Sequence, residues 1–161
     1  MAKSTVKFKD SVAEYERIAA EIAARRFSGI YLLMGEESYF IDALAEQLAA
    51  TILDEASRAF NQITVYGRDS EAGQIINLCR QMPMMGSYQV VILKEVQAVS
   101  ADFLKPLAAY AANPTATTVL CVCFRGAKAK GAEFLKGVKA GGGVVFEAQK
   151  VKEAQVPTIV S

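Results

Sequence analysis

The sequence predicts an α/β protein with a doubly wound, five-stranded parallel sheet and helices on both faces. Two observations lead to this class. Helix-like and strand-like segments alternate along the chain, and the strand-like segments are short and mostly apolar throughout. Such strands are buried on both faces, as strands are in a parallel sheet between two helix layers. The 161 residues are enough for one domain with a core, and the net charge of +1 gives no overall attraction to nucleic acid.

The first predicted element is a helix over residues 11–26. Ser11 and Glu14 form a capping box at its start. Arg25 and Arg26 suit its C-terminal end, where positive charge is favourable. The apolar residues between these ends share one face, so the helix is expected to pack on the sheet.

Five strands, with four helices between them, are predicted to follow. The strands are expected within residues 30–34, 60–67, 88–95, 117–124 and 141–148. The helices show apolar residues at three- and four-residue spacing. In chain order these residues are Ile41, Leu44, Leu48 and Ile52; Ala72, Ile75, Ile76 and Cys79; Phe103, Leu104, Leu107, Ala108 and Ala111; and Phe134, Leu135 and Val138. Crossovers between parallel strands should be right-handed, whereas the strand order does not follow from the sequence.

The residue types exclude several kinds of chemistry. The chain has no histidine, which removes the commonest general base and most zinc sites. Its three cysteines, Cys79, Cys121 and Cys123, have no disulfide-framework spacing and are predicted to be buried structural thiols. No catalytic residue, metal ligand or cofactor is therefore predicted.

The ends of the chain give expectations about location and domains. MAKSTVKFKD lacks the apolar core of a signal peptide, and no apolar run approaches the ~20 residues of a membrane span, so a cytoplasmic protein is expected. Residues 1–150 are predicted to form one domain. Residues 151–161 are predicted to start a truncated second, helical domain, with Pro157 opening a helix.

The stretch LLMGEESYF has the position of a phosphate-binding loop, after the first strand and before a helix. A P-loop motif that starts at Gly35 needs glycine at Phe40, lysine at Ile41 and serine or threonine at Asp42, and none of these is present. The scaffold therefore resembles that of a P-loop nucleotide-binding protein, but the residues that hold phosphate are missing.

The loop also carries negative charge where phosphate would bind. At ~4 Å, Glu36 or Glu37 would repel a phosphate by on the order of a few kcal/mol. Both acids are explained more simply as anions at the start of the next helix, beside Ser38, where they stabilise by up to ~1 kcal/mol. Gly35, Glu36, Glu37 and Ser38 are thus predicted to form a degenerate phosphate loop that does not bind ATP.

Two other parts of a nucleotide site can be tested. An acid that holds magnesium is expected after the third strand, but Lys94 stands there, followed by Glu95. A polar sensor is expected after the fourth strand, where Arg125 is present and is interpreted as a solvated loop residue. Both chemical ends of a nucleotide site are therefore missing.

Three segments resemble a known family. YLLMGEESYFIDALAEQL, LCRQMPMMGSYQVVILKE and GAEFLKGVKAGGGVVFEA are similar to the N-terminal domain of the delta subunit of bacterial DNA polymerase III, a part of the clamp loader. The resemblance extends over about residues 28–161. It implies an AAA+-like fold without ATP binding, and further helical and collar domains in full-length members. It also implies a subunit of the polymerase holoenzyme with no catalysis of its own.

The resemblance implies that this domain binds the sliding clamp and opens its ring during DNA replication. The family contact is an apolar pair, typically Leu-Phe, which corresponds here to Met84 and Met85. Pro83 and Gly86 flank the pair and predict a turn, where burial of large apolar side chains is not expected. The implied partners are the clamp (beta subunit), the gamma/tau ATPase and delta-prime subunits, and DNA only through the assembled complex.

Four alternatives remain open. The three methionines Met82, Met84 and Met85 could simply close the end of the core. A diverged P-loop nucleotide-binding enzyme would share the scaffold, although it lacks its lysine and magnesium ligand. A receiver-like signalling domain would need an aspartate in place of Lys94. A generic protein-binding α/β module would use the same methionine turn with another partner.

Overall fold

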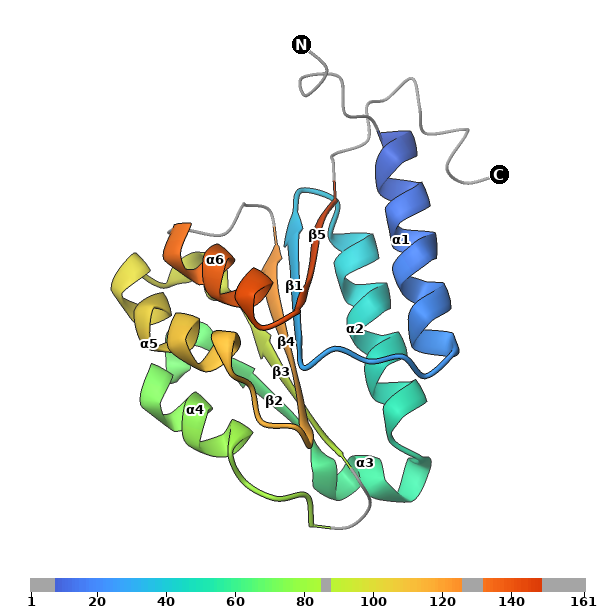
Figure 1. Cartoon of the computed structure of the whole chain (residues 1–161). Coiled ribbons are helices and arrows are strands. Elements are labelled where there is room, and N and C mark those ends of the chain that lie inside the picture. The colour runs from blue at the N-terminus through green and yellow to red at the C-terminus, as the bar shows by residue number, and fades with distance from the viewer. Residues whose placement is uncertain (1–7, 85–87, 126–131, 149–161) are drawn as a thin grey trace.

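The predicted five-stranded, doubly wound parallel sheet is confirmed by the computed structural model, which describes residues 8–84, 88–125 and 132–148 (Figure 1). The strands are β1 (Ile30–Gly35), β2 (Gln62–Tyr66), β3 (Gln89–Lys94), β4 (Thr118–Arg125) and β5 (Val144–Ala148). Their order in the sheet is β2-β3-β4-β1-β5, and all four neighbouring pairs are parallel. All strands therefore begin at one edge of the sheet, here called the amino edge, and end at the opposite, carboxyl edge.

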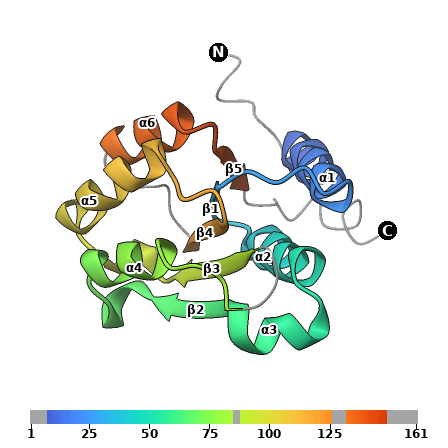
Figure 2. The same cartoon turned by 60° about the horizontal axis from the view of Figure 1, so that its bottom comes forward.

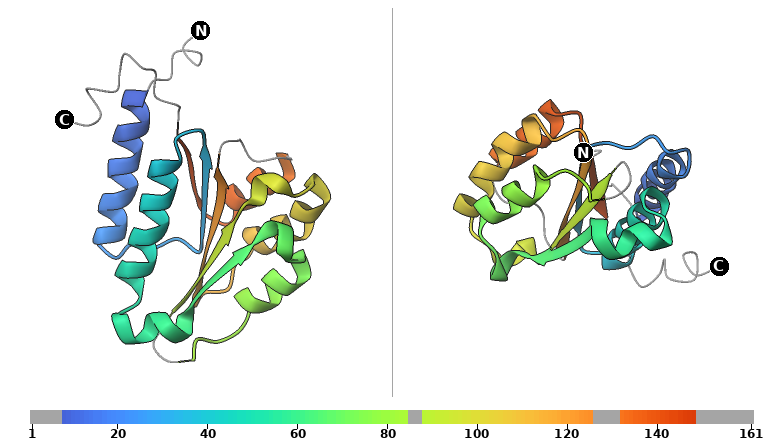
Figure 3. Two further views of the ribbon diagram at one scale, coloured as in Figure 1. Left: turned by 180° about the vertical axis from the view of Figure 1, so that it is seen from behind. Right: turned by 90° about the horizontal axis from the view of Figure 1, so that it is seen from below.

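Helices cover both faces of the sheet, as Figure 3 shows from behind and from below. The helices are α1 (Phe8–Ala23), α2 (Ser38–Ile52), α3 (Glu55–Asn61), α4 (Ala72–Cys79), α5 (Ala101–Ala112) and α6 (Ala132–Ala140), with short 3-10 turns at Gly67–Asp69 and Val96–Ala98. The layer of α1 and α2 packs on one face and that of α4, α5 and α6 on the other. Successive β1 residues alternate between the two cores, with Tyr31 and Leu33 in the first and Leu32 in the second.

The first helix differs from its predicted bounds at both ends. It begins at Phe8, so Ser11 lies inside the helix, buried, and the predicted capping box is wrong. It ends at Ala23, and Arg25 adopts a left-handed conformation (φ 63°) beyond it. The Arg25 guanidinium donates to the carbonyl of Thr51 (2.6 Å), which ties the helix exit to α2. A left-handed residue of this kind commonly ends a helix.

Helix α3 was not predicted. It occupies the first two residues of the predicted strand 60–67, so β2 begins only at Gln62. Asp54 starts the helix by accepting a hydrogen bond from the Ser57 amide (2.8 Å). Seven residues are too few to show a clear helical period, which is why the pattern favoured a strand. Figure 2 shows α3 at the start of β2.

Side chains of the sheet bond the last two carbonyls of helix α4. The side-chain amide of Gln89 donates to the carbonyl of Leu78 (2.5 Å), and the Thr118 hydroxyl donates to that of Cys79 (2.6 Å). The helix ends at Cys79, four residues before Pro83. The chain then crosses to β3 at the amino edge of the sheet.

Two predictions about the ends of the chain are not addressed by the fold. The predicted second domain, residues 151–161, and the boundary at residue 150 lie outside the described residues. Within the part of the chain that the structure describes, no helix is long and apolar enough to cross a membrane.

Candidate functional site

The loop at the carboxyl end of β1 has the position predicted for a phosphate loop, but its backbone is already bonded. Gly35 has a positive φ (118°), and a Cβ there would lie 2.2 Å from the carbonyl oxygen of Ala148. The Glu36 amide donates to the same oxygen (3.0 Å). Phosphate binding uses backbone amides that point at the ligand, and here the end of β5 takes the Glu36 amide.

The positions that a P-loop would give to glycine and lysine are part of the hydrophobic core. Phe40 and Ile41 are 5% and 0% exposed, and both pack in the core of the α1 and α2 layer. A lysine at position 41 would thus enter the core. The start of α2 therefore differs from a P-loop in more than its residue types, because its side chains at these positions pack in the core.

The charges of this loop lie where the sequence predicted them. Glu36 is exposed, Glu37 occupies the N-cap position without a side-chain capping bond, and Ser38 begins α2. Arg125 ends β4 opposite Gly35 in the sheet register, rather than lying in the loop beyond the strand. Its guanidinium pairs with Asp42 of α2 (3.6 Å), and both side chains are about half exposed.

The end of β3 also lacks the chemistry of a nucleotide site. Lys94 is the last residue of the strand, and Glu95 follows in a left-handed conformation (φ 58°). The Glu95 carboxylate accepts from the Arg68 guanidinium (2.9 Å) rather than facing the β1 loop. Within the described ranges, no group of three or more acidic, cysteine or histidine side chains could hold a metal.

The three thiols are buried, as predicted. Burial raises the pKa of the Cys79 thiol to about 12. The Cys121 and Cys123 sulfurs lie 4.0 Å apart in β4, and this contact, together with burial, raises the pKa of Cys121 well above its ordinary value. A thiol nucleophile needs a lowered pKa and access to solvent, so these groups serve packing rather than chemistry.

At the amino edge of the sheet, the connection from α4 to β3 exposes large apolar side chains. Met82 and Met84 are 72% and 75% exposed, and Pro83 between them is partly buried. Met85 and Gly86, the other predicted contact residues, lie outside the described residues. For Met84, the alternative that the methionines close the core is wrong, because its side chain is at the surface.

The main chain at Met84 is held from α3. The Met84 amide donates to the side-chain oxygen of Asn61 (3.0 Å), the last residue of that helix. Asn61 is buried at 1% exposure, whereas its neighbour Phe60 is 54% exposed. No local pattern indicates this contact, because the two residues are 23 positions apart and lie in different elements.

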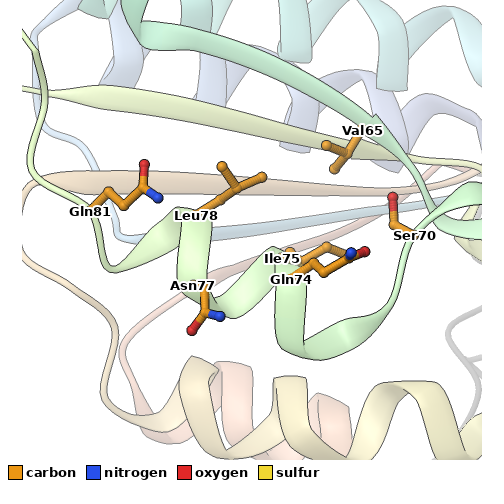
Figure 4. A pocket seen from close by; sticks show the side chains of 7 residues that line it. All are labelled: Val65, Ser70, Gln74, Ile75, Asn77, Leu78 and Gln81. Carbon is orange, nitrogen blue, oxygen red and sulfur yellow. The ribbon is translucent and has the colours of Figure 1, made fainter.

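An open hollow of about 380 Å³ lies between α4 and the edge strand β2 (Figure 4). Its lining residues are Val65, Ser70, Gln74, Ile75, Asn77, Leu78 and Gln81. None of these side chains is ionisable, so the hollow offers no acid or base. A ligand there would meet apolar surface and uncharged hydrogen-bonding groups. One of the lining residues, Gln81, directly precedes Met82.

Comparison with known proteins points to one family. The family described as DNA polymerase III, delta subunit, matches residues 31–149. No curated protein matches. The solved structure of the Bacillus subtilis DNA clamp loader delta protein has a TM-score of 0.76 at 17% identity, covering 90% of this chain and 45% of its own. A DNA polymerase III gamma subunit-related protein from Thermotoga maritima has a TM-score of 0.58 at 13% identity, covering 91% and 49%. At these identities the two structures show the fold, and this chain spans about half the length of each.

Proposed function

We propose that this chain, which belongs to the DNA polymerase III delta subunit family, binds a sliding clamp through the turn that carries Met84 and favours the open form of its ring. The observation that carries this proposal is the exposure of Met84, at 75%, together with the bond that holds its backbone amide to Asn61. Burial of a large, exposed apolar side chain in a partner's pocket would be favourable, and such exposed side chains often mark binding sites.

The state of the phosphate loop supports a mechanical rather than a catalytic role. The Glu36 amide is bonded to Ala148, and Ile41 is buried where a P-loop has its lysine. We therefore propose that the chain has no catalysis of its own and takes no nucleotide. A diverged nucleotide-binding enzyme is not favoured by any feature of this loop.

The proposed mechanism is differential affinity for two states of the clamp. Met84, with Met85, would enter an apolar pocket of the clamp, and tighter binding to the open ring would shift the clamp toward that form. Burying two such side chains supplies roughly 3–6 kcal/mol. The proposed partners are the clamp, the gamma/tau ATPase and delta-prime subunits, with DNA contacted through the assembly in the cytoplasm.

The test is calorimetric titration of the 161-residue chain into the cognate sliding clamp. The Met84→Ala/Met85→Ala variant is expected to bind at least about 100-fold more weakly, equivalent to about 2.7 kcal/mol. The control is Tyr39→Ala, which removes a 65% exposed aromatic side chain near the carboxyl edge and should leave affinity unchanged. Circular dichroism checks that all variants are folded.

The outcomes separate the candidate functions. Equal affinity of the methionine variant and the wild type would place the contact elsewhere on the chain. Failure of the wild-type chain to bind the clamp would sink the proposed function and favour a protein-binding module with another partner. A nucleotide titration, described below, addresses the enzyme alternative separately.

A further inference from the structure

We infer that the C-terminal end of α3 belongs to the same clamp-binding surface, with Phe60 as an apolar anchor and Asn61 as the positioning residue for Met84. This inference rests on the proposed function. It extends the proposed contact from the segment around Met84 to helix α3, which the sequence did not predict. The surface is defined here by Phe60, Met82 and Met84 and is called the apolar edge surface.

The first observation is which large apolar side chains are exposed. Among the described residues, five large hydrophobic side chains are exposed, and three of them form the apolar edge surface: Phe60 at 54%, Met82 at 72% and Met84 at 75%. The other two are tyrosines, Tyr39 in the first turn of α2 and Tyr66 at the end of β2. The purely apolar members thus lie on two neighbouring segments at the amino edge.

The second observation is the hydrogen bond that joins those two segments. The Asn61 side chain is 1% exposed and accepts from the Met84 amide at 3.0 Å. Together with the fixed spacing of adjacent Cα atoms, this bond places the Phe60 Cα within about 10 Å of the Met84 nitrogen. It uses only the main chain of Met84, so the methionine side chain remains exposed.

The chemistry of the surface fits an apolar protein pocket. None of the residues from Ala59 to Asn61 or from Gln81 to Met84 carries a charge. Nucleic acid binding depends on cations that contact phosphates. The arginines that precede these two stretches are engaged elsewhere, since Arg58 pairs with Glu46 and Arg80 lies over the Tyr110 ring. A rigid aromatic side chain beside adaptable methionines is the composition of an interface anchor. The clamp pocket proposed for Met84 would therefore extend to Phe60.

The first experiment measures Phe60 by the same calorimetric titration into the cognate clamp. Phe60→Ala is expected to weaken binding about tenfold, which corresponds to about 1.4 kcal/mol. Phe60→Leu, which stays large and apolar, should retain most of the affinity, and Tyr39→Ala should retain all of it. In a double-mutant cycle, Phe60→Ala and Met84→Ala should be non-additive, because one pocket receives both side chains.

The second experiment tests the positioning role of Asn61. In Asn61→Ala, amide hydrogen exchange at Met84 should accelerate at least about tenfold, because the acceptor that protects this amide is gone. Clamp affinity should fall although every anchor side chain is intact. Asn61→Asp keeps an oxygen acceptor at this position, so the folded variant should preserve the protection of the Met84 amide, although burial of the carboxylate lowers its stability.

The results distinguish failure of this inference from failure of the proposed function. If Met84→Ala weakens binding and Phe60→Ala does not, the inference is overturned and the proposed function stands. If the wild-type chain does not bind the clamp, both fall. The Phe60 titrations do not depend on Asn61, so they decide the matter even if Asn61→Ala is too unstable to study.

Discussion

The two edges of the sheet treat their connecting loops in opposite ways. At the carboxyl edge, the loop after β1 has the position of a phosphate loop. The carbonyl of Ala148 in β5 accepts from the Glu36 amide and lies against Gly35. At the amino edge, Asn61 holds the main chain at Met84 and leaves the side chain in solvent. The comparison indicates that what a loop can bind depends on which of its groups are left without a partner. The path of the backbone matters less.

The largest expected effect is at Gly35, and it should separate the two edges. Gly35→Ala is expected to lower the free energy of unfolding by at least about 3 kcal/mol, because φ is 118° and the new Cβ would overlap the Ala148 carbonyl. Clamp affinity of the folded fraction should not change. The matched control is Gly73→Ala in α4, where no atom lies within 4 Å and a gain of about 0.4–1 kcal/mol is expected.

Urea unfolding measures the stability of both glycine variants. A loss below about 1 kcal/mol for Gly35→Ala would show that the loop can relax away from β5, since an unrelieved overlap costs more. The carboxyl edge would then be adaptable rather than closed, and the contrast between the edges would weaken.

The next effect concerns the polar contacts that end α4. Thr118→Val keeps the shape of the side chain but removes the hydroxyl that donates to the Cys79 carbonyl and accepts from Gln89. Because Thr118 is fully buried, the change should cost about 1–3 kcal/mol of unfolding free energy. Thr64→Val in β2, at an exposed position, should change stability by less than about 0.5 kcal/mol.

Thermal unfolding compares the two valine variants directly. Equal stabilities would mean that the end of α4 does not depend on the Thr118 hydroxyl. Hydrogen exchange in Thr118→Val should also accelerate at the Gln81 amide, which bonds to the Leu78 carbonyl next to the lost contact. The amino edge is thus expected to be anchored from the sheet as well as from α3.

A smaller effect is expected for the ion pair beside the phosphate loop. Arg125 and Asp42 lie 3.6 Å apart with about half of each side chain exposed, so Arg125→Gln should change stability by about 0.5 kcal/mol or less. The double variant with Asp42→Asn should differ little from either single variant in a urea titration. A coupling above about 1 kcal/mol would mark this pair as more than a surface contact.

The smallest expected effect is that of nucleotide, which should be zero. Neither the wild type nor a Glu36→Gln/Glu37→Gln variant is expected to give heat on titration with Mg-ATP. The neutral variant is the decisive one, because it removes the repulsion and leaves the bonded amide and the buried Ile41. Binding by that variant would mean that charge alone had blocked the loop.

Local patterns of the sequence predicted most of the fold. The continuous apolar run from Val90 to Leu93 predicted a strand buried on both faces, and the helical spacing around Leu104 and Leu107 predicted α5. Helix α3 was missed because it is short and its capping residue, Asp54, precedes too few apolar positions. The capping box at Ser11 was a chance match inside a longer helix.

The sites were predictable only where they depend on neighbours in the chain. The absence of the P-loop residues after Gly35 could be predicted from a short motif. The turn around Pro83 stays a prediction, because residues 85–87 lie outside the described residues. The close contact of the Ala148 carbonyl with Gly35 and the hydrogen bond from Met84 to Asn61 join residues far apart in sequence. No local pattern encodes such contacts. Strand order is unpredictable for the same reason.

The strand order also bears on how the chain folds. Strand β3 pairs with partners that are near in sequence, as Gln62 with Val90 and Gln89 with Thr118 show. Strand β1 pairs with partners that come much later in the chain, Ile30 with Leu120 and Tyr31 with Val144. Contacts that are nearer in sequence close at a lower entropic cost and tend to form earlier. The half of the sheet that bears the methionine turn is therefore expected to assemble first, and pulse-labelled hydrogen exchange should protect β3 before β1. A growing chain would then acquire its proposed clamp contact before β5 pairs with β1 and bonds the Glu36 amide.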